Sequence, residues 1–168
     1  MQTNPINTED DKLVNEGDIH QFLTFCLGDE EYGVDIMQVM EIRSWTATTR
    51  LPNTPDFVLG IINLRGVVVP VLYIRLRFGM TPAELTGKSV VIILSSVERT
   101  LGILVDSVSD ILEVRANNIK APPPMSDAIE DAFLHGLVSI DKRMVVLLST
   151  EKLFSERLLH HIDIKENT

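Results

Sequence analysis

Few residues of this sequence have the type and spacing that catalysis requires. None of the four histidines has an acid or a nucleophile at a recognisable spacing, so a histidine-based triad would have no local signal in the sequence. The single cysteine, Cys26, lies in an alternating apolar segment and has no basic neighbour to make its thiol reactive. It is typical of a small buried side chain. The histidines are His20, His135, His160 and His161.

The usual signals for a bound phosphate or metal are also missing. Gly60 and Gly66 are followed by valines where a phosphate-binding loop needs a lysine. Asp106 and Asp110 lack the glutamate ligand set of a calcium loop, and one cysteine excludes a multi-cysteine zinc site. We therefore expect neither a metal nor a cofactor. One alternative is a small hydrolase or transferase, which would hold His135 or Asp110 in a deep polar cleft.

The charge of the chain argues against two classes of partner. The sequence has 15 Lys+Arg and 24 Asp+Glu, a net charge of −9, and only 5% aromatic residues. Nucleic acids and anionic membranes both need clustered positive charge, and a nucleic-acid-binding barrel also needs exposed aromatics. Such a barrel is the second alternative, with binding that falls steeply as salt rises. The segment 43–77 does carry five arginines against one acid, Asp56.

Much of the acidity belongs to the N-terminal segment. Residues 1–31 contain eight acids and one lysine, and we expect residues 1–17 to be an acidic, disordered tail. That segment lacks the apolar core of a signal peptide, and the chain has no apolar run long enough for a membrane-spanning helix. These features predict a soluble, cytoplasmic protein without direct membrane insertion.

The residues that could bind a partner must be positioned mainly by strands. Period-two alternation and turn residues predict a succession of strands joined by short turns. In the segment 38–43 we expect Met40 and Ile42 to face inward and Val39, Glu41 and Arg43 to face outward. The predicted strands cover residues 21–27, 32–36, 38–43, two strands within 60–71 joined by a turn at 63–66, 89–94, 101–105, 134–140 and 144–148.

Two helices are predicted between and after these strands. Thr54, Pro55 and Asp56 have the chemistry of a helix start, with a cap, a tolerated proline and an acid in the first turn, and Gly60 would end that helix. From Thr150 onward apolar residues recur at helical spacing, which predicts a C-terminal amphipathic helix.

A diverged repeat is the most informative internal feature. A first self-alignment of the chain, which sets Gly33 against Gly102, also brings Ile42 onto Ile111. A second self-alignment sets Gly60 against Gly136. Two such units would be weak alone but could share a core.

The repeat leads to a prediction of the fold. We expect a mainly β domain over residues 18–162, built from two small β-barrel subdomains at about 18–85 and 86–162. The first strand could pair across them. Chance similarity between apolar strands is the alternative.

One surface stands out as a candidate binding patch. Val39, Glu41 and Arg43 are expected on one outward face, and Arg65 lies at a turn that ends in glycine, where it could contact a carboxylate with two hydrogen bonds. Exposed apolar residues beside a few charges are typical of protein-binding patches. Two interpretations stay open. The charges bind a partner, or Glu41 and Arg65 form a surface ion pair worth less than ~1 kcal/mol.

Several segments together resemble the CheW family of bacterial chemotaxis coupling proteins. They are FLTFCLGDEEYG at 22–33, VMEIR at 39–43, LPNTP at 51–55, GIINLRGVVVPV at 60–71, GILVDSVSDIL at 102–112 and the segment 144–154. The string around Asn63, Leu64, Arg65 and Gly66 is the most specific of them. The similarity covers most of the chain, from near Gln21 to the predicted terminal helix.

The resemblance implies a function that the residues alone do not. It implies two five-stranded barrels, short joining helices, and a non-enzymatic adaptor, monomeric alone, that joins chemoreceptor tips to the histidine kinase CheA in membrane-associated arrays. The positions that match the family's receptor groove are Val39, Glu41, Arg65, Val90 and Ile111. The positions that match its kinase contact are Lys120 and Met125.

The sequence departs from the family pattern at the start of one helix and at the kinase contact. Tyr73 stands where the family has a capping aspartate, so that helix start lacks its cap. Ser149 holds the equivalent place in the second repeat and can cap instead. At the kinase contact, Met125 replaces an aromatic residue and Lys120 replaces an arginine.

Overall fold

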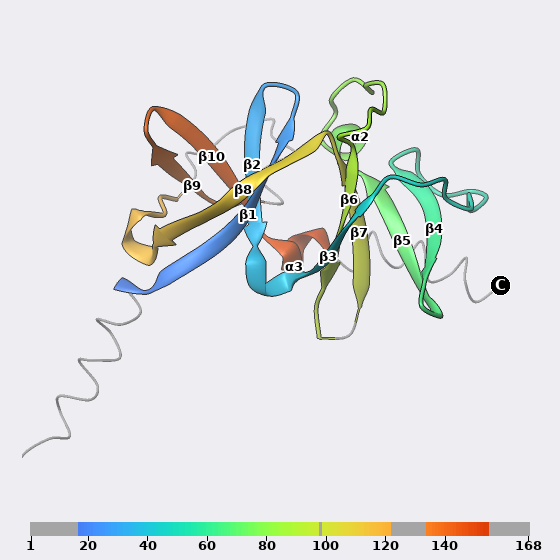
Figure 1. Ribbon diagram of the computed structural model, residues 1–168, viewed down its shortest axis with the longest axis horizontal. Helices are drawn as coiled ribbons and strands as arrows, with labels where there is room; N and C mark the ends of the chain where they lie inside the picture. The colour runs from blue at the N-terminus through green and yellow to red at the C-terminus, as the bar shows by residue number, and fades with distance from the viewer. Residues whose placement is uncertain (1–16, 98, 122–133, 155–168) are drawn as a thin grey trace, which may run out of the picture.

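A computed structural model describes residues 17–97, 99–121 and 134–154 of the chain (Figure 1). Most of these residues lie in strands. Residues 1–16 of the tail expected at 1–17 lie outside the described residues, as do Met125 and the part of the expected C-terminal helix beyond Phe154. The strands are β1 (Ile19–Leu27), β2 (Glu30–Asp35), β3 (Val39–Ser44), β4 (Val58–Leu64), β5 (Val67–Tyr73), β6 (Val90–Ser95), β7 (Thr100–Val105), β8 (Ser107–Arg115), β9 (Leu134–Ile140) and β10 (Arg143–Leu148). The short helices are η1 (Ile36–Gln38), α2 (Ile74–Arg77), η2 (Ala116–Asn118) and α3 (Thr150–Leu153).

The strands form two five-stranded sheets that lie side by side (Figure 1). The order in sheet A is β8-β1-β2-β10-β9, and the order in sheet B is β3-β6-β7-β5-β4. Neighbouring strands are antiparallel, except for the parallel pairs β2–β10 and β5–β7. The mainly β fold of two packed five-stranded units is therefore confirmed.

The repeat seen in the sequence relates the two sheets to each other. The first self-alignment brings β2 onto β7 and β3 onto β8, and the second brings β4, β5 and α2 onto β9, β10 and α3. Each sheet combines strands from both repeats, and β1 pairs with β8 across them. The expected boundary near residue 85 therefore does not separate the sheets, because the chain crosses between them after β2 and again after β7.

Each sheet is closed toward a barrel by a single bridge between its two ends. After β3, Thr49 exchanges backbone hydrogen bonds of 2.9 and 2.8 Å with Ile61 of β4. After β8, Lys120 makes the equivalent pair with Leu137 of β9, at 2.8 Å each. These close approaches explain the glycines next to the bridges. A Cβ on Gly60 would stand 2.3 Å from the Thr49 carbonyl oxygen.

The main hydrophobic core lies between the two sheets. It includes Leu23 and Phe25 of β1 together with Leu72 of β5, Ile92 and Leu94 of β6. Smaller clusters fill each sheet's own barrel, around Val71 and Ile93 in sheet B and around Val138 and Leu147 in sheet A. Because the largest core is shared, neither sheet buries its apolar surface without the other.

The predicted helix at residues 54–60 is absent, and a turn replaces it. The Thr54 hydroxyl donates to the Leu51 carbonyl at 3.0 Å, and the Val58 amide donates to the Pro55 carbonyl at 3.0 Å. Val58 already pairs with Leu72, so β4 begins where the helix would have continued. Pairing within the sheet outweighs the local helix signal.

The two helix starts behave as their cap residues predict. Tyr73 precedes α2 and makes no capping hydrogen bond with its side chain. Ser149 precedes α3, and its hydroxyl accepts a hydrogen bond from the Lys152 amide at 3.3 Å. The tyrosine hydroxyl instead exchanges hydrogen bonds with Ala83, at 3.2 and 3.0 Å.

The predicted orientation of β3 is wrong. Met40 and Ile42 are 49% and 44% exposed, whereas Val39 is partly buried against the shared core. The cause is a β-bulge: Val39 lies opposite Leu94 and Glu41 lies opposite Ile93, so Met40 is an extra residue. The bulge shifts the phase of the alternation within the strand. Glu41 and Arg43 then lie opposite Ile93 and Val91, on the face of sheet B that lines the interior of its own barrel, here called barrel B.

Candidate functional site

The side chains of Glu41 and Arg65 form an ion pair on the surface of sheet B. Arg65 donates from Nη2 to Glu41 Oε2 at 2.6 Å, and its side chain is 70% exposed. Arg43 lies 3.8 Å from the other carboxylate oxygen. The turn between β4 and β5 presents Arg65, where φ is +51° and Asn63 Oδ1 accepts a hydrogen bond from the Gly66 amide at 2.8 Å. The pairing that the sequence left open therefore does form.

The equivalent positions in sheet A carry no such pair. The first self-alignment brings Glu41 onto Asp110 and the second brings Arg65 onto Asp141, so two acids replace an acid and a base. Asp110 Oδ1 instead accepts a hydrogen bond from the Thr24 hydroxyl at 2.8 Å. The Glu41–Arg65 pair thus distinguishes the two halves of a nearly symmetric molecule.

The apolar residues expected at the receptor groove divide into two kinds. Val39 and Val90 lie near opposite ends of the β3–β6 ladder and are partly buried against the shared core. Ile111 on β8 is 54% exposed. The structure therefore brings Glu41 and Arg65 into contact, while the two valines contribute mainly to packing.

Ile42 is a candidate contact residue that the sequence interpretation missed. It lies opposite Ile92 of the shared core, and Ile111 lies opposite Leu23 of the same core. Directly opposed residues on neighbouring strands lie on the same face of their sheet. Each isoleucine therefore lies on the face of its own sheet that packs into the shared core, at the solvent-exposed margin of that face. Strands β3 and β8 both start in the middle of the molecule, between the sheets (Figure 1). The repeat pairs Ile42 with Ile111, and that signal could have identified it.

The residues expected at a kinase contact are only partly described. Lys120 is exposed and belongs to the bridge that closes sheet A. Met125 lies outside the described residues. Lys120 therefore lies beside sheet A, whereas the Glu41–Arg65 pair lies on sheet B. The positions expected at the receptor contact and at the kinase contact are thus on different sheets.

A partly buried ion pair joins the sheets where the chain crosses from β7 to β8. Arg75 of α2 donates to the two carboxylate oxygens of Asp106 at 2.8 and 2.6 Å, and the Gly28 amide donates to the same carboxylate at 2.7 Å. The hydrogen bonds from Arg75 hold the pKa of Asp106 below its usual value, and the same contact raises the pKa of Arg75. This contact ties α2, the β1–β2 turn and the crossover together.

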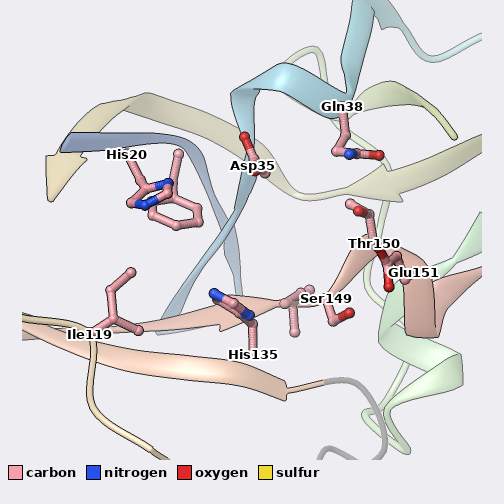
Figure 2. Close-up of a pocket in the computed structure, with 10 residues that line it drawn as sticks. His20, Asp35, Gln38, Ile119, His135, Ser149, Thr150 and Glu151 are labelled. Carbon is pink, nitrogen blue, oxygen red and sulfur yellow. The ribbon is translucent and has the colours of Figure 1, made fainter. Parts of the chain in front are cut away.

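The expected alternative was a deep polar cleft that holds His135 or Asp110, and the described residues show only one part of it. His135 lines a polar cavity beside α3, but Asp110 lies elsewhere and is bonded to Thr24 (Figure 2). The Ser149 hydroxyl in that cavity accepts from a helix amide. Within the described residues no three His, Cys, Asp or Glu side chains are placed to hold a metal ion. Among the same residues, no helix has the length and apolar character to span a membrane.

Two small barrels that share a core and present a charged and apolar surface define a protein-binding module. The model of the CheW-like domain family matches residues 21–158. A probable chemotaxis protein CheW from Rhizobium etli is 44% identical over 145 residues, covering 86% of this chain and 93% of the relative. The chemotaxis protein CheW of Klebsiella aerogenes is 41% identical over 152 residues, covering 90% and 92%.

A solved structure agrees with these sequence matches. The scaffolding protein TtCheW from Thermoanaerobacter tengcongensis superposes with a TM-score of 0.73 at 33% identity, covering 77% of this chain and 88% of the other. The chain therefore belongs to the CheW family. It is a chemotaxis adaptor, a scaffold rather than an enzyme.

Proposed function

We propose that this adaptor couples the helical cytoplasmic tips of chemoreceptors to the histidine kinase CheA, so that receptors control kinase activity. Family membership supports the partners, and the exposed Glu41–Arg65 pair is the observation that carries the assignment of the receptor surface. In the cell the protein is recruited to receptor arrays at the membrane through these contacts. It binds neither nucleic acid nor the lipid bilayer itself, in keeping with its net charge of −9.

The receptor surface combines apolar burial with two fixed charges. Ile111 and its counterpart Ile42 offer apolar area to one face of an incoming helix, and Val39 and Val90 support them from the shared core. Full burial of an exposed isoleucine contributes about 1.5–3 kcal/mol. Because Ile111 and Ile42 are already about half buried, the two together can supply roughly the amount of one such side chain, a modest share of a micromolar affinity. Glu41 and Arg65 then fix the orientation of the helix, because each can bond an opposite charge on it.

The kinase surface is a separate one, near the bridge that closes sheet A. Lys120 is exposed there, and Met125 follows it in the chain. Two surfaces on one rigid body raise the effective concentration of one partner near the other. A conformational bias of the receptor can then reach the kinase through position alone, without any chemical step in the adaptor.

Binding measurements with the two partners held apart test this division. Receptor fragments in vesicles and the isolated regulatory domain of CheA are each titrated with wild-type protein, Glu41→Arg and Met125→Asp. We expect Glu41→Arg to weaken receptor binding about tenfold or more and to leave kinase binding intact, and Met125→Asp to do the opposite. If both variants affected only receptor binding, the assignment of the two surfaces would be wrong.

A further inference from the structure

The carboxylate of Asp106 bridges the two sheets at a very short crossover. β7 of sheet B ends just before Asp106 and β8 of sheet A begins just after it, so this residue alone connects the two strands. Its carboxylate accepts a hydrogen bond from the Gly28 amide, in the β1–β2 turn of sheet A. It also accepts from the guanidinium of Arg75, on the helix that follows β5 of sheet B. The Arg75 side chain is 12% exposed and that of Asp106 is 28% exposed, so salt screens this charged pair only weakly.

The hydrogen bonds around Arg75 leave it one geometry. Nε and Nη2 donate to the two carboxylate oxygens at 2.8 and 2.6 Å, and Nη1 donates to the Thr81 carbonyl at 2.8 Å. The Asp106 amide donates to the Cys26 carbonyl of β1 at 3.2 Å. A planar fork that is bound at several points tolerates little rotation, so turning one sheet against the other would break several bonds together. The contacts among Gly28, Arg75 and Asp106 are called the crossover clamp below.

The shared core holds the sheets together in a less directional way. It consists of apolar side chains from both sheets, and the gain from burying them follows the area removed from water. Hydrogen bonds, in contrast, weaken steeply as their angles change. The core therefore supplies most of the attraction between the sheets, and the crossover clamp selects the angle between them.

The β2–β3 crossover is built differently. There Asp35 Oδ1 accepts a hydrogen bond from the Met37 amide at 2.9 Å, which is a contact within the crossover itself. The second self-alignment brings Arg75 of α2 onto Glu151 of α3, so α3 presents an acid where α2 presents a base. In the described part of the chain, the ion pair between the sheets therefore belongs to the β7–β8 crossover.

The receptor surface proposed above is built from both sheets. Glu41 and Ile42 belong to β3 of sheet B, whereas Ile111 belongs to β8 of sheet A, the strand that starts directly after Asp106. The relative position of these side chains therefore depends on the angle between the sheets. The position expected at the kinase contact, Lys120, lies beside sheet A alone.

We propose that Arg75 and Asp106 are positioning residues for receptor recognition, because the crossover clamp holds Ile111 at a fixed place relative to Ile42 and Glu41. The inference rests on the receptor-binding function proposed above. Neither clamp residue needs to touch the receptor. A surface whose two halves are already held in place has a smaller ordering cost when a helix binds to it. Contacts made within one sheet do not depend on the clamp.

NMR of the full chain measures the angle between the sheets without any partner. Residual dipolar couplings of the backbone N–H groups are fitted separately for sheet A and sheet B in the wild type, Asp106→Asn and Arg75→Lys. We expect one alignment tensor to fit both sheets of the wild type, and two tensors of different magnitude or orientation in each variant. Arg75→Lys keeps the charge and loses the fork, so it remains informative if Asp106→Asn does not fold.

Binding measurements connect the angle to recognition. Receptor fragments in vesicles and the isolated regulatory domain of CheA are each titrated with the same proteins. Both clamp variants should bind the receptor about tenfold more weakly and the kinase domain as the wild type does. Val71→Ala is the matched control, because this buried side chain lies in the cluster of barrel B. It lowers stability through a cavity within one sheet, and should keep a single tensor and wild-type affinities.

The outcomes separate the clamp from the function on which it rests. A single tensor in both clamp variants would overturn the proposal, and so would equal losses of receptor and kinase affinity. The same holds if Val71→Ala matched the clamp variants in either measurement. Failure of the wild type to bind the receptor would contradict the proposed function instead, and the couplings would still decide whether the clamp sets the angle.

Discussion

The carboxylate of Glu41 and the guanidinium of Arg65 lie 2.6 Å apart, although 24 residues separate them in the chain. A bulge in β3 turns the first residue toward barrel B, and a turn with positive φ presents the second. The Arg65 side chain is 70% exposed and that of Glu41 is 27% exposed. With one partner mostly in solvent, the pair adds about 1 kcal/mol or less to folding. A pair of so little structural value suits recognition better than stability.

Reversing the charge of Arg65, alone or together with that of Glu41, separates the effect of the pair on receptor binding from its effect on folding. Arg65→Glu should leave the free energy of unfolding within about 1 kcal/mol of the wild type and weaken co-sedimentation with receptor vesicles about tenfold or more. The double variant Glu41→Arg/Arg65→Glu restores an ion pair of opposite direction. It should regain stability but not receptor binding. Recovery of binding in the double variant would mean that the pair acts only by holding the turn.

The exposed isoleucines of the two repeats should contribute similarly to receptor binding. Ile42→Asp and Ile111→Asp each remove apolar area and add a charge at the surface between the sheets, so each should weaken receptor binding about tenfold. Val97→Asp is the matched control, because Val97 is equally apolar and fully exposed at the β6–β7 turn. A loss of binding in the control as large as in the other two variants would remove the case for a specific apolar surface.

The glycines beside the closing bridges should be needed for folding. Gly60→Ala combines an unfavourable φ of +143° with a methyl group 2.3 Å from a backbone oxygen, and should cost more than about 2 kcal/mol in a urea unfolding experiment. Gly136→Ala should cost less, since the nearest atom is a side-chain methyl of Ile119 at 2.6 Å. Gly87→Ala, with open space around it, should be neutral. Equal stability of all three variants would contradict the role given to the bridges.

The Arg75–Asp106 contact should make stability depend on acid pH. The pKa of Asp106 is lowered in the folded protein, so its contribution is complete above the unfolded value of about 3.9 and is lost as the pH falls through the folded value. Asp106→Asn should therefore be less stable than the wild type by about 1–3 kcal/mol at pH 6, with a difference that narrows below about pH 4. Urea unfolding of both proteins from pH 3 to pH 6 measures this. A difference that stays constant over the whole range would contradict it.

The sequence predicted the repeat and the two-unit architecture because paired glycines mark positions where the backbone needs close approach. Gly60 and Gly136 lie beside equivalent bridges, and Gly33 and Gly102 face side chains at 3.1 and 2.9 Å. The exchange of strands between the sheets could not be predicted in this way. A repeat gives the similarity of two units but does not say whether a strand pairs within its own unit or with the other.

The candidate site was predicted less completely, for a local reason. Period-two alternation assigned Met40 and Ile42 to the interior, but both are exposed. One extra residue at Met40 places Ile42 opposite Ile92, on the core-facing side but at its exposed margin. A bulge leaves no clear mark on a short apolar segment, since Val39 and Ile42 are equally suited to either face. The turn at Thr54 was missed because pairing of Val58 with Leu72 is a long-range contact that local helix signals do not report.

Reconstitution of kinase control tests the central claim most directly. CheA, a receptor signalling fragment and this protein are combined, and CheA autophosphorylation is measured with and without receptor ligand. We predict that the wild-type chain makes kinase activity responsive to the receptor, whereas the stable double variant Glu41→Arg/Arg65→Glu binds the kinase without that response. Full receptor control by the double variant, or none by the wild type, would contradict coupling through the Glu41–Arg65 surface.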